Sequence, residues 1–267
     1  MLLSPDYLAA QLNSLLPEPQ SSLINGMVLG RELTSGKEFT KQLKDTGIIH
    51  LVVLSGSNIS LVTAIICSST RWLSKKSQLL LSVLLTGIFV IFVRAEAPIL
   101  RAYIMSVLTS VSIILGRKRE ILYILFLSGL LSLLVFPSWA TSISFQLSYA
   151  ATLGIILFGS GKGIKRDSNS ITSYVSESLR VTCAAQLFTT PIIAFYFRQV
   201  SIVSPLTNTL IGWTVLPIMV GGILSYISIL LLPFAAPLFY YPIFGLATYI
   251  VYIVRILSMI PYAAWYF

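Results

Sequence analysis

The stretch GIIHLVVLSGSNISLV, from Gly47 to Val62, places a histidine and a Ser-Gly-Ser-Asn cluster among residues apolar enough to enter a lipid bilayer. Polar groups at that depth cost free energy unless they find partners, and the cost falls inside a protein interior or a wet cavity. Gly56 and Asn58 both tolerate left-handed backbone conformations, so one interpretation is a helix that is broken near Ser55–Asn58. The alternative is a continuous helix whose serines bond back to the preceding turn.

The composition of the whole chain is that of an integral membrane protein. Of the 267 residues, 56% are hydrophobic and 10% are charged, and the mean hydropathy is +0.88. A soluble domain would carry about 25% charged residues. The composition therefore argues against a soluble fold with several buried helices.

Because one crossing of the hydrocarbon core takes about 20 apolar residues, the spans can be predicted from the apolar runs. We predict them at residues 48–68, 78–93, 98–115, 121–135, 143–159, 180–197, 205–232 and 239–260. The seventh is long for one straight crossing and holds Pro217, so we expect either one kinked helix or two short ones. The expected fold class is all-α, a polytopic transmembrane helix bundle of about eight spans with one or more broken helices.

Basic residues are concentrated in every second loop. The loops after the first, third and fifth predicted spans are basic, and the loops between them are poor in Lys and Arg. The basic residues in these three loops are Arg71, Lys75, Lys76, Arg117, Lys118, Arg119, Lys162, Lys165 and Arg166. Since Lys and Arg collect in cytoplasmic loops, this pattern predicts a multi-pass protein of the cytoplasmic (inner) membrane with its N-terminus outside. The same rule accounts for most of the net charge of +9.

Three arginines fall on the outer side of the membrane in this topology, against the usual bias. Arg94 closes the second predicted span, Arg101 lies one turn into the third, and Arg198 closes the sixth. One interpretation is that each extends to the headgroups or pairs locally, for example with Glu96. The other is a ring of cations at the mouth of a pore, where the three arginines contact DNA phosphates.

Residues 1–46 differ from the rest and are expected as an N-terminal segment before a membrane domain at 47–267. Ser35 and Glu38 have capping-box spacing and predict a short helix that Gly47 ends as a left-handed cap. Phe39 and Leu43 lie on one face of this helix, with three lysines beside them, Lys37, Lys41 and Lys44. We predict an interfacial amphipathic helix whose basic face meets lipid headgroups or another anionic ligand.

Polar side chains recur within the fifth predicted span, where Gln146 lies between Ser144 and Ser148. Their role is either hydrogen bonding between helices or lining of a wet path. On the second interpretation, the candidate pore-lining residues are His50, Ser55, Gly56, Asn58, Gln146 and Ser148. No catalytic motif is evident, and a single histidine argues against a His-rich metal cluster, so we expect no enzyme activity, no metal and no cofactor.

Three short motifs resemble those of the ComEC-type competence protein family, the inner-membrane channel domain for DNA internalisation. The first has the form Gly-x-x-His-Leu-x-x-x-Ser-Gly and matches residues 47–56; the second, Pro-x-x-Arg-Ala-x-x-Met, matches residues 98–105. The third, Phe-Gln-Leu-Ser at 145–148, is followed by Ala-Thr-Leu-Gly at 151–154. The resemblance covers the transmembrane core, about residues 25–260. Asn58 stands where family members often carry a second histidine, so the resemblance does not extend to a role that needs two imidazoles.

The resemblance implies a channel component that takes up single-stranded DNA across the cytoplasmic membrane during natural transformation. Larger relatives add an OB-like domain and a metallo-β-lactamase-like domain, neither of which is found in this sequence. The expected partners are single-stranded DNA, the lipid bilayer, a separate metallo-β-lactamase-like nuclease, a cytoplasmic DNA motor and further copies of the chain in a homo-oligomer. Two other functions stay open: a secondary transporter of a small polar or anionic solute, and a non-transporting membrane scaffold.

Overall fold

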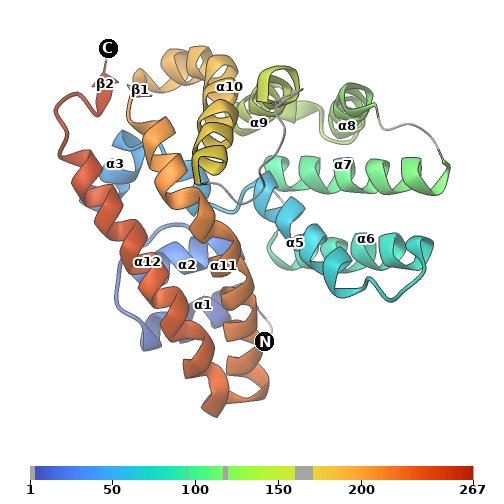
Figure 1. The fold of residues 1–267 in the computed structure, drawn as a ribbon, viewed down its shortest axis with the longest axis horizontal. Helices are drawn as coiled ribbons and strands as arrows, with labels where there is room; N and C mark the ends of the chain where they lie inside the picture. The colour runs from blue at the N-terminus through green and yellow to red at the C-terminus, as the bar shows by residue number, and fades with distance from the viewer. Residues whose placement is uncertain (1–3, 95, 117–119, 160–170, 267) are drawn as a thin grey trace. The chain divides into compact units, whose positions relative to one another are not determined.

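The computed structural model describes residues 4–94, 96–116, 120–159 and 171–266, and nearly all of its regular structure is helical (Figure 1). The chain forms two compact units. The first contains Met1–Asn58 and Gln199–Phe267, and the second contains Ile59–Arg198. Helix α5 (Gly56–Ser69) begins in the first unit and continues into the second.

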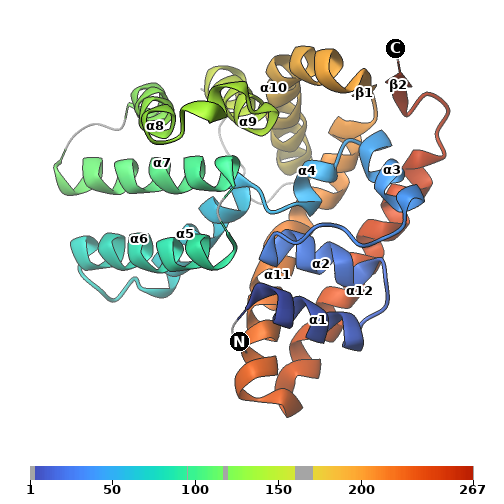
Figure 2. The same ribbon diagram turned by 180° about the vertical axis from the view of Figure 1, so that it is seen from behind.

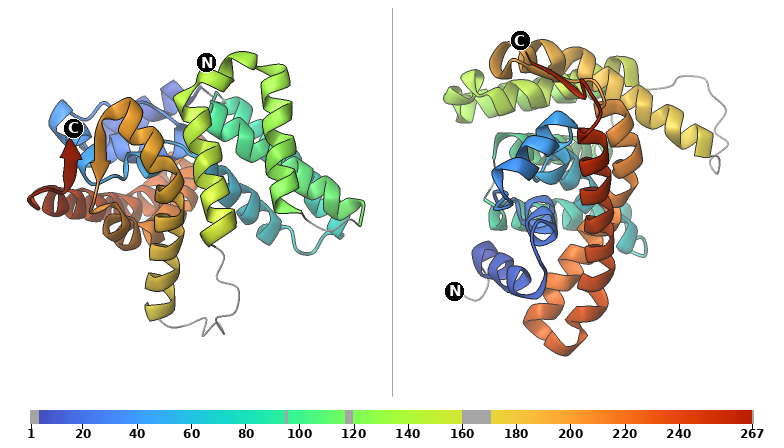
Figure 3. Two further views of the ribbon diagram at one scale, coloured as in Figure 1. Left: turned by 90° about the horizontal axis from the view of Figure 1, so that it is seen from above. Right: turned by 90° about the vertical axis from the view of Figure 1, so that its left-hand side faces the viewer.

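The first unit is built on two long helices, α11 (Ser204–Leu231) and α12 (Ala236–Ser258), which pack along each other. A 3-10 turn at Pro233–Ala235 joins them. The N-terminal helices α1 (Pro5–Leu15) and α2 (Gln20–Leu29) lie on one side of this pair, as the right-hand view in Figure 3 shows.

Helix α2 contacts both long helices and is the core of the first unit (Figure 2). Nine of its ten residues, from Ser21 to Leu29, are buried. A Cβ on Gly222 of α11 would come within 2.6 Å of the Val28 side chain, so the absence of a side chain there permits close packing of the two helices. The buried Asn25 amide is satisfied across the unit, because the Tyr226 hydroxyl donates to its Oδ1 at 2.6 Å. Helix α2 thus shares a hydrophobic core with α11 and α12.

Three smaller elements complete the first unit. Helix α3 (Lys37–Asp45) and the single turn α4 (Ile49–Val52) follow α2. Strands β1 (Gln199–Ser201) and β2 (Ala264–Tyr266) pair antiparallel, with Gln199 opposite Tyr266.

The second unit is an all-helical array. It continues from α5 through α6 (Lys75–Phe92), α7 (Ala97–Ile114), α8 (Ile121–Val135), the 3-10 helix η1 (Pro137–Thr141), α9 (Ile143–Gly154), the π-helical turn η2 (Ile155–Gly159) and α10 (Ile171–Phe197). Helices α6 and α7 lie side by side (Figure 1), and α9 packs along α10. A Cβ on Gly154 of α9 would collide with the Ala184 carbonyl of α10, so this glycine permits the close contact.

The all-α prediction is confirmed, but the prediction of about eight spans is not. Among the described residues, five helical segments are long and apolar enough to cross a membrane: Lys75–Phe92, Ala97–Ile114, Thr172–Phe197, Ser204–Leu231 and Pro233–Ser258. The apolar helices Gly56–Ser69, Ile121–Val135 and Ile143–Gly159 are shorter. The predicted seventh span is one continuous helix, α11, with Pro217 inside it.

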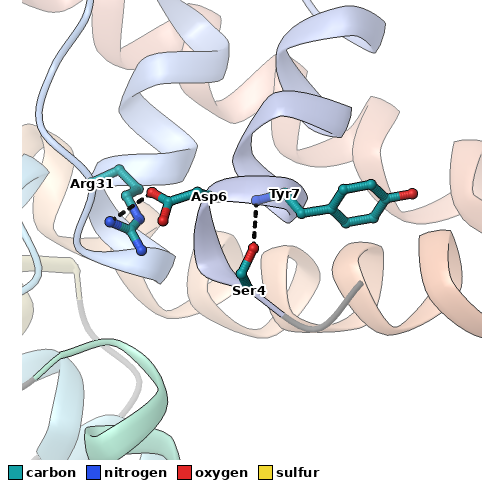
Figure 4. Close-up of polar contacts among 4 residues, drawn as sticks. All are labelled: Ser4, Asp6, Tyr7 and Arg31. Atoms are coloured by element: carbon teal, nitrogen blue, oxygen red, sulfur yellow. Dashed lines mark hydrogen bonds and ion pairs between the residues drawn. The ribbon is translucent and has the colours of Figure 1, made fainter. Parts of the chain in front are cut away.

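The N-terminal caps differ from the prediction at one helix. Gly36, not Ser35, is the N-cap of α3, and no side chain caps that helix. A serine cap is found on α1 instead, where the Ser4 hydroxyl accepts a hydrogen bond from the Tyr7 amide at 3.2 Å (Figure 4). In the same region an ion pair of 2.9 Å joins Arg31 to Asp6 and ties the segment after α2 to the first turn of α1.

Candidate functional site

The helix break expected in the first motif is present. Helix α4 ends at Val52 and α5 begins at Gly56, so residues 53–55 are not helical. The interpretation as one continuous helix is therefore wrong, and the break lies just before the position that the sequence predicted. Broken helices free backbone donors and acceptors inside a helical bundle, and transporters place binding sites at such points.

Asn58 holds the break in place. Its side chain is fully buried and its Nδ2 donates to the Met27 carbonyl of α2 at 3.0 Å. The hydroxyls of Ser55 and Ser57 both donate to its Oδ1 at 3.4 Å and lie 2.6 Å from each other. The amide that stands in place of the family's second histidine thus has a structural role, because it anchors the start of α5 to the core of its unit.

His50 does not join this cluster. It lies on α4 with its side chain exposed, and no hydrogen bond links it to the Ser55–Asn58 region within the described residues. Gly56, the first residue of α5, is buried. Of the four predicted pore-lining residues in the first unit, Ser55 and Asn58 are therefore in direct contact, and a pore-lining role for all four stays a prediction.

Gly47, the first residue of the motif, is explained by backbone geometry. It ends α3 with a left-handed φ of +70°, which confirms the predicted cap. A Cβ at this position would come within 2.5 Å of the Ser204 Cβ at the start of α11. Beside it, the Ser201 hydroxyl donates to the Asp45 carbonyl at 2.7 Å. Only glycine satisfies both the conformation and the close contact.

The second and third motifs meet in the second unit around Arg101. Nη1 of this arginine donates to the Thr152 hydroxyl of α9 at 2.7 Å and approaches the Met105 sulfur at 3.4 Å. Its guanidinium lies 5.7 Å from the centre of the Tyr149 ring, a cation–π distance. Met105 belongs to the same motif as Arg101, whereas Tyr149 and Thr152 belong to or adjoin the third motif. Sequence elements about 50 residues apart therefore build one cluster.

Arg101 is buried without a negative partner in this cluster. Only 8% of the residue is exposed, its Nε has no hydrogen-bond partner in the described part of the chain, and none of its three contacts is acidic. The sequence-based partner, Glu96, is not among them. A buried, uncompensated guanidinium is costly in an apolar interior, so Arg101 is a candidate functional residue. We name Arg101, Met105, Tyr149 and Thr152 the arginine cluster.

Arg94 and Arg198 differ from Arg101 in both exposure and backbone. Each follows the end of a long helix, α6 or α10, and each has a left-handed φ, +61° and +49° respectively. Both side chains are exposed. The two arginines therefore terminate helices at the surface, and contact of all three arginines with DNA stays a prediction.

Gln146 and Ser148 lie on α9, close to the arginine cluster in sequence. The Gln146 Nε2 donates to the Ala140 carbonyl of η1 at 3.0 Å, which fixes the start of α9. The Ser148 carbonyl accepts a hydrogen bond from the Thr152 hydroxyl at 2.8 Å, so Ser148 supports the residue that binds Arg101. Sequence reasoning did not assign a role to Thr152 and Tyr149, although the Ala-Thr-Leu-Gly run at 151–154 was a signal for the former.

Comparison with known proteins defines the class. The chain matches the family model described as Competence protein over residues 27–267, and it therefore belongs to the Competence protein family. It has the apolar helices of a membrane protein.

Two curated relatives are similar to the chain. ComE operon protein 3 of Bacillus subtilis (strain 168) is 29% identical over 223 residues, which cover 79% of this chain and 27% of that protein. An uncharacterized protein of Aquifex aeolicus (strain VF5) is 30% identical over 188 residues, 70% of this chain and 43% of the relative. The chain thus spans less than half the length of both relatives. No solved structure matches it.

Proposed function

We propose that the chain is a channel component through which single-stranded DNA crosses the cytoplasmic membrane during natural transformation. Membership of the Competence protein family and similarity to a ComE operon protein support a role in competence. The chain carries the strand without breaking bonds in it. Processing of the strand and the driving force come from partners, a metallo-β-lactamase-like nuclease and a cytoplasmic DNA motor, and further copies of the chain complete the channel.

The observation that carries the proposal is the arginine cluster. A strand that enters a low-dielectric region brings one negative charge for each nucleotide, and a fixed cation lowers the cost of that charge. Arg101 is held by neutral partners, and within the described residues no acceptor binds its buried Nε, so no acidic side chain seen there neutralises its charge. Because its partners come from two helices, α7 and α9, its position is set before the strand arrives.

Transformation frequency in cells whose only family member is this chain tests the proposal. Arg101→Ala removes the cation, and we expect uptake of labelled DNA to fall by at least about tenfold, which corresponds to about 1.4 kcal/mol. Arg255→Ala is the matched control, because Arg255 is an exposed arginine in the last turn of α12. Immunoblotting of membranes checks that both variants insert. Unchanged uptake in Arg101→Ala at equal protein level would remove the arginine from the mechanism.

The helix break favours a second candidate, a secondary transporter of a small anionic solute. The break sets the Ser55 and Ser57 hydroxyls beside the N-terminal turn of the 14-residue helix α5, whose dipole attracts negative charge. Reconstituted liposomes separate the two functions. Solute flux that is independent of DNA and lost in Ser55→Ala would favour the transporter.

A further inference from the structure

Helix α3 carries a stripe of three exposed lysines. Lys37, Lys41 and Lys44 follow the i, i+4, i+7 spacing that places residues on one helical face. The apolar residues Phe39 and Leu43 are 7% and 0% exposed, because α3 packs against α12, α4 and β1 (Figure 1). The apolar face is therefore occupied by the protein itself and is not available for insertion into lipid, while the lysines remain free of that packing.

These lysines line an open cavity of about 570 Å³ within the first unit. Its other polar wall residues include Ser35, Gln199 and Tyr266. We name this cavity the lysine groove. Its lining is strongly basic, since the three lysines are the only charged side chains among the described residues that form its wall.

The end of the groove near the start of α3 holds unused hydrogen-bond donors. Ser35 is only 7% exposed, and its hydroxyl has no partner in the part of the chain that the structure describes. The next residue, Gly36, is the N-cap, and no side chain satisfies the first-turn amides. Free amides at a helix N-terminus together with an unpaired hydroxyl favour an anion such as a phosphate.

The lining of the groove also includes an aromatic side chain, Tyr266, that is held by hydrogen bonds. The Asp45 carboxylate accepts hydrogen bonds from Gln199 Nε2, at 3.1 Å, and from the Tyr266 hydroxyl. Tyr266 also pairs with Gln199 across the β1–β2 ribbon. With its hydroxyl and backbone held, Tyr266 remains 52% exposed, so part of its ring faces outward. Nucleobases stack on aromatic rings of this kind.

We propose that the lysine groove binds single-stranded nucleic acid, with phosphates on the three lysines and the N-terminus of α3, and a base against Tyr266. A lipid headgroup or free phosphate would bind the lysines but has no base to stack on Tyr266. The choice of DNA as the strand rests on the proposed function, whereas the combination of lysines, donors and ring is a property of the groove. In the predicted topology the groove lies on the outer side, where a strand would arrive.

Equilibrium binding of a labelled oligothymidylate to the full chain in nanodiscs of neutral lipid tests the role of the lysines. In Lys37→Gln/Lys41→Gln/Lys44→Gln, we expect an affinity at least about tenfold lower at about 0.1 M salt, where charges are only partly screened. The slope of log affinity against log salt should become shallower by about 2, from about 0.7 for each of three lost contacts. The matched control, Arg71→Gln/Lys75→Gln/Lys76→Gln, also removes three exposed cations and should bind as the unaltered chain does. Equal affinity of the α3 variant and the unaltered chain would overturn the proposal.

Substitutions of Tyr266 distinguish binding of a nucleic acid from binding of a lipid headgroup or free phosphate. Tyr266→Leu should weaken oligothymidylate binding several-fold, because stacking is worth about 1–3 kcal/mol for each base, whereas Tyr266→Phe should retain most of it. Competition by inorganic phosphate and binding of anionic vesicles should be insensitive to either change. Loss of vesicle binding in the lysine variant, with oligothymidylate binding intact, would identify a headgroup site and refute the proposal.

Failure of the groove and failure of the proposed function give different results. If the groove binds the strand but cells lacking this chain take up DNA normally, the proposed function fails and the groove stands as a nucleic-acid site. If the lysine variant binds the strand as tightly as the unaltered chain while Arg101→Ala abolishes uptake, the groove proposal fails and the proposed function stands.

Discussion

The helix break of the first unit and the arginine cluster of the second are both polar features in apolar surroundings, but their hydrogen bonding differs. At the break, the Asn58 side-chain nitrogen donates a hydrogen bond to the Met27 carbonyl, and its oxygen accepts hydrogen bonds from two serine hydroxyls. In the cluster, Arg101 has an Nε with no partner and no acidic contact among the residues that the structure describes. Satisfied buried groups stabilise a fold, whereas an unsatisfied buried charge costs stability. The contrast shows that the polar groups of the break have partners within the fold, and it supports the proposal that the cluster is kept for function.

The largest effect on stability is expected at Gly47, at the corner between α3 and α4. Gly47→Ala places a Cβ in a left-handed backbone position and against Ser204, which should lower the free energy of unfolding by about 2–4 kcal/mol. Thermal unfolding in detergent measures the change. Gly245→Ala is the control, since nothing lies within 4 Å of its Cβ position, and it should be neutral or slightly stabilising. Equal stability of the two variants would show that the α3–α4 corner is not fixed by this glycine.

A smaller loss is expected at Asn58. Asn58→Ala removes the donor to the buried Met27 carbonyl and should cost about 1–3 kcal/mol. Uptake of DNA should fall only as far as the amount of folded protein falls. Ser57→Ala changes an exposed hydroxyl of the same cluster and should stay within about 0.5 kcal/mol of the unaltered chain. A loss of uptake per folded molecule in Asn58→Ala would show that the helix break also takes part in uptake, and would contradict the contrast between the two sites.

The smallest effect concerns Tyr266, which lies outside the predicted spans. Burial and the hydrogen bond to Asp45 raise the pKa of this phenol to about 12 from its ordinary 10.0. Because the folded pKa is the higher one, the contribution to stability is fully present below pH 10 and is lost as the pH rises through about 12. Tyr266→Phe should remove this part of the alkaline dependence, as measured by unfolding between these two pH values. An unchanged alkaline profile would show that the phenol ionises without effect on the fold.

Several local features were predictable because they depend on short stretches of sequence. The left-handed cap at Gly47 and the break before Asn58 follow from residues that tolerate unusual backbone angles. The apolar runs likewise predicted an all-helical membrane chain. The Ser35 cap failed although its spacing was correct, because α3 begins one residue later and Gly36 takes the cap position.

Features that depend on distant partners were not predictable from one sequence. The side chain of Asn25 in α2 is satisfied by Tyr226, which lies 201 residues away in the sequence. For Arg101 the sequence offers Glu96, lipid headgroups or DNA phosphates as partners, whereas its hydrogen-bond partner Thr152 lies 51 residues further along the chain. The motif resemblance indicated both elements of the arginine cluster, but only the fold brings them into contact.

Unfolding and uptake measured together on Arg101→Met test the central claim most directly. If the charge is kept for function, its replacement by an apolar residue should leave the melting temperature unchanged or higher while uptake falls by at least about tenfold. A melting temperature lowered as far as in Asn58→Ala, with uptake per folded molecule unchanged, would show that Arg101 is a structural residue and would contradict the account.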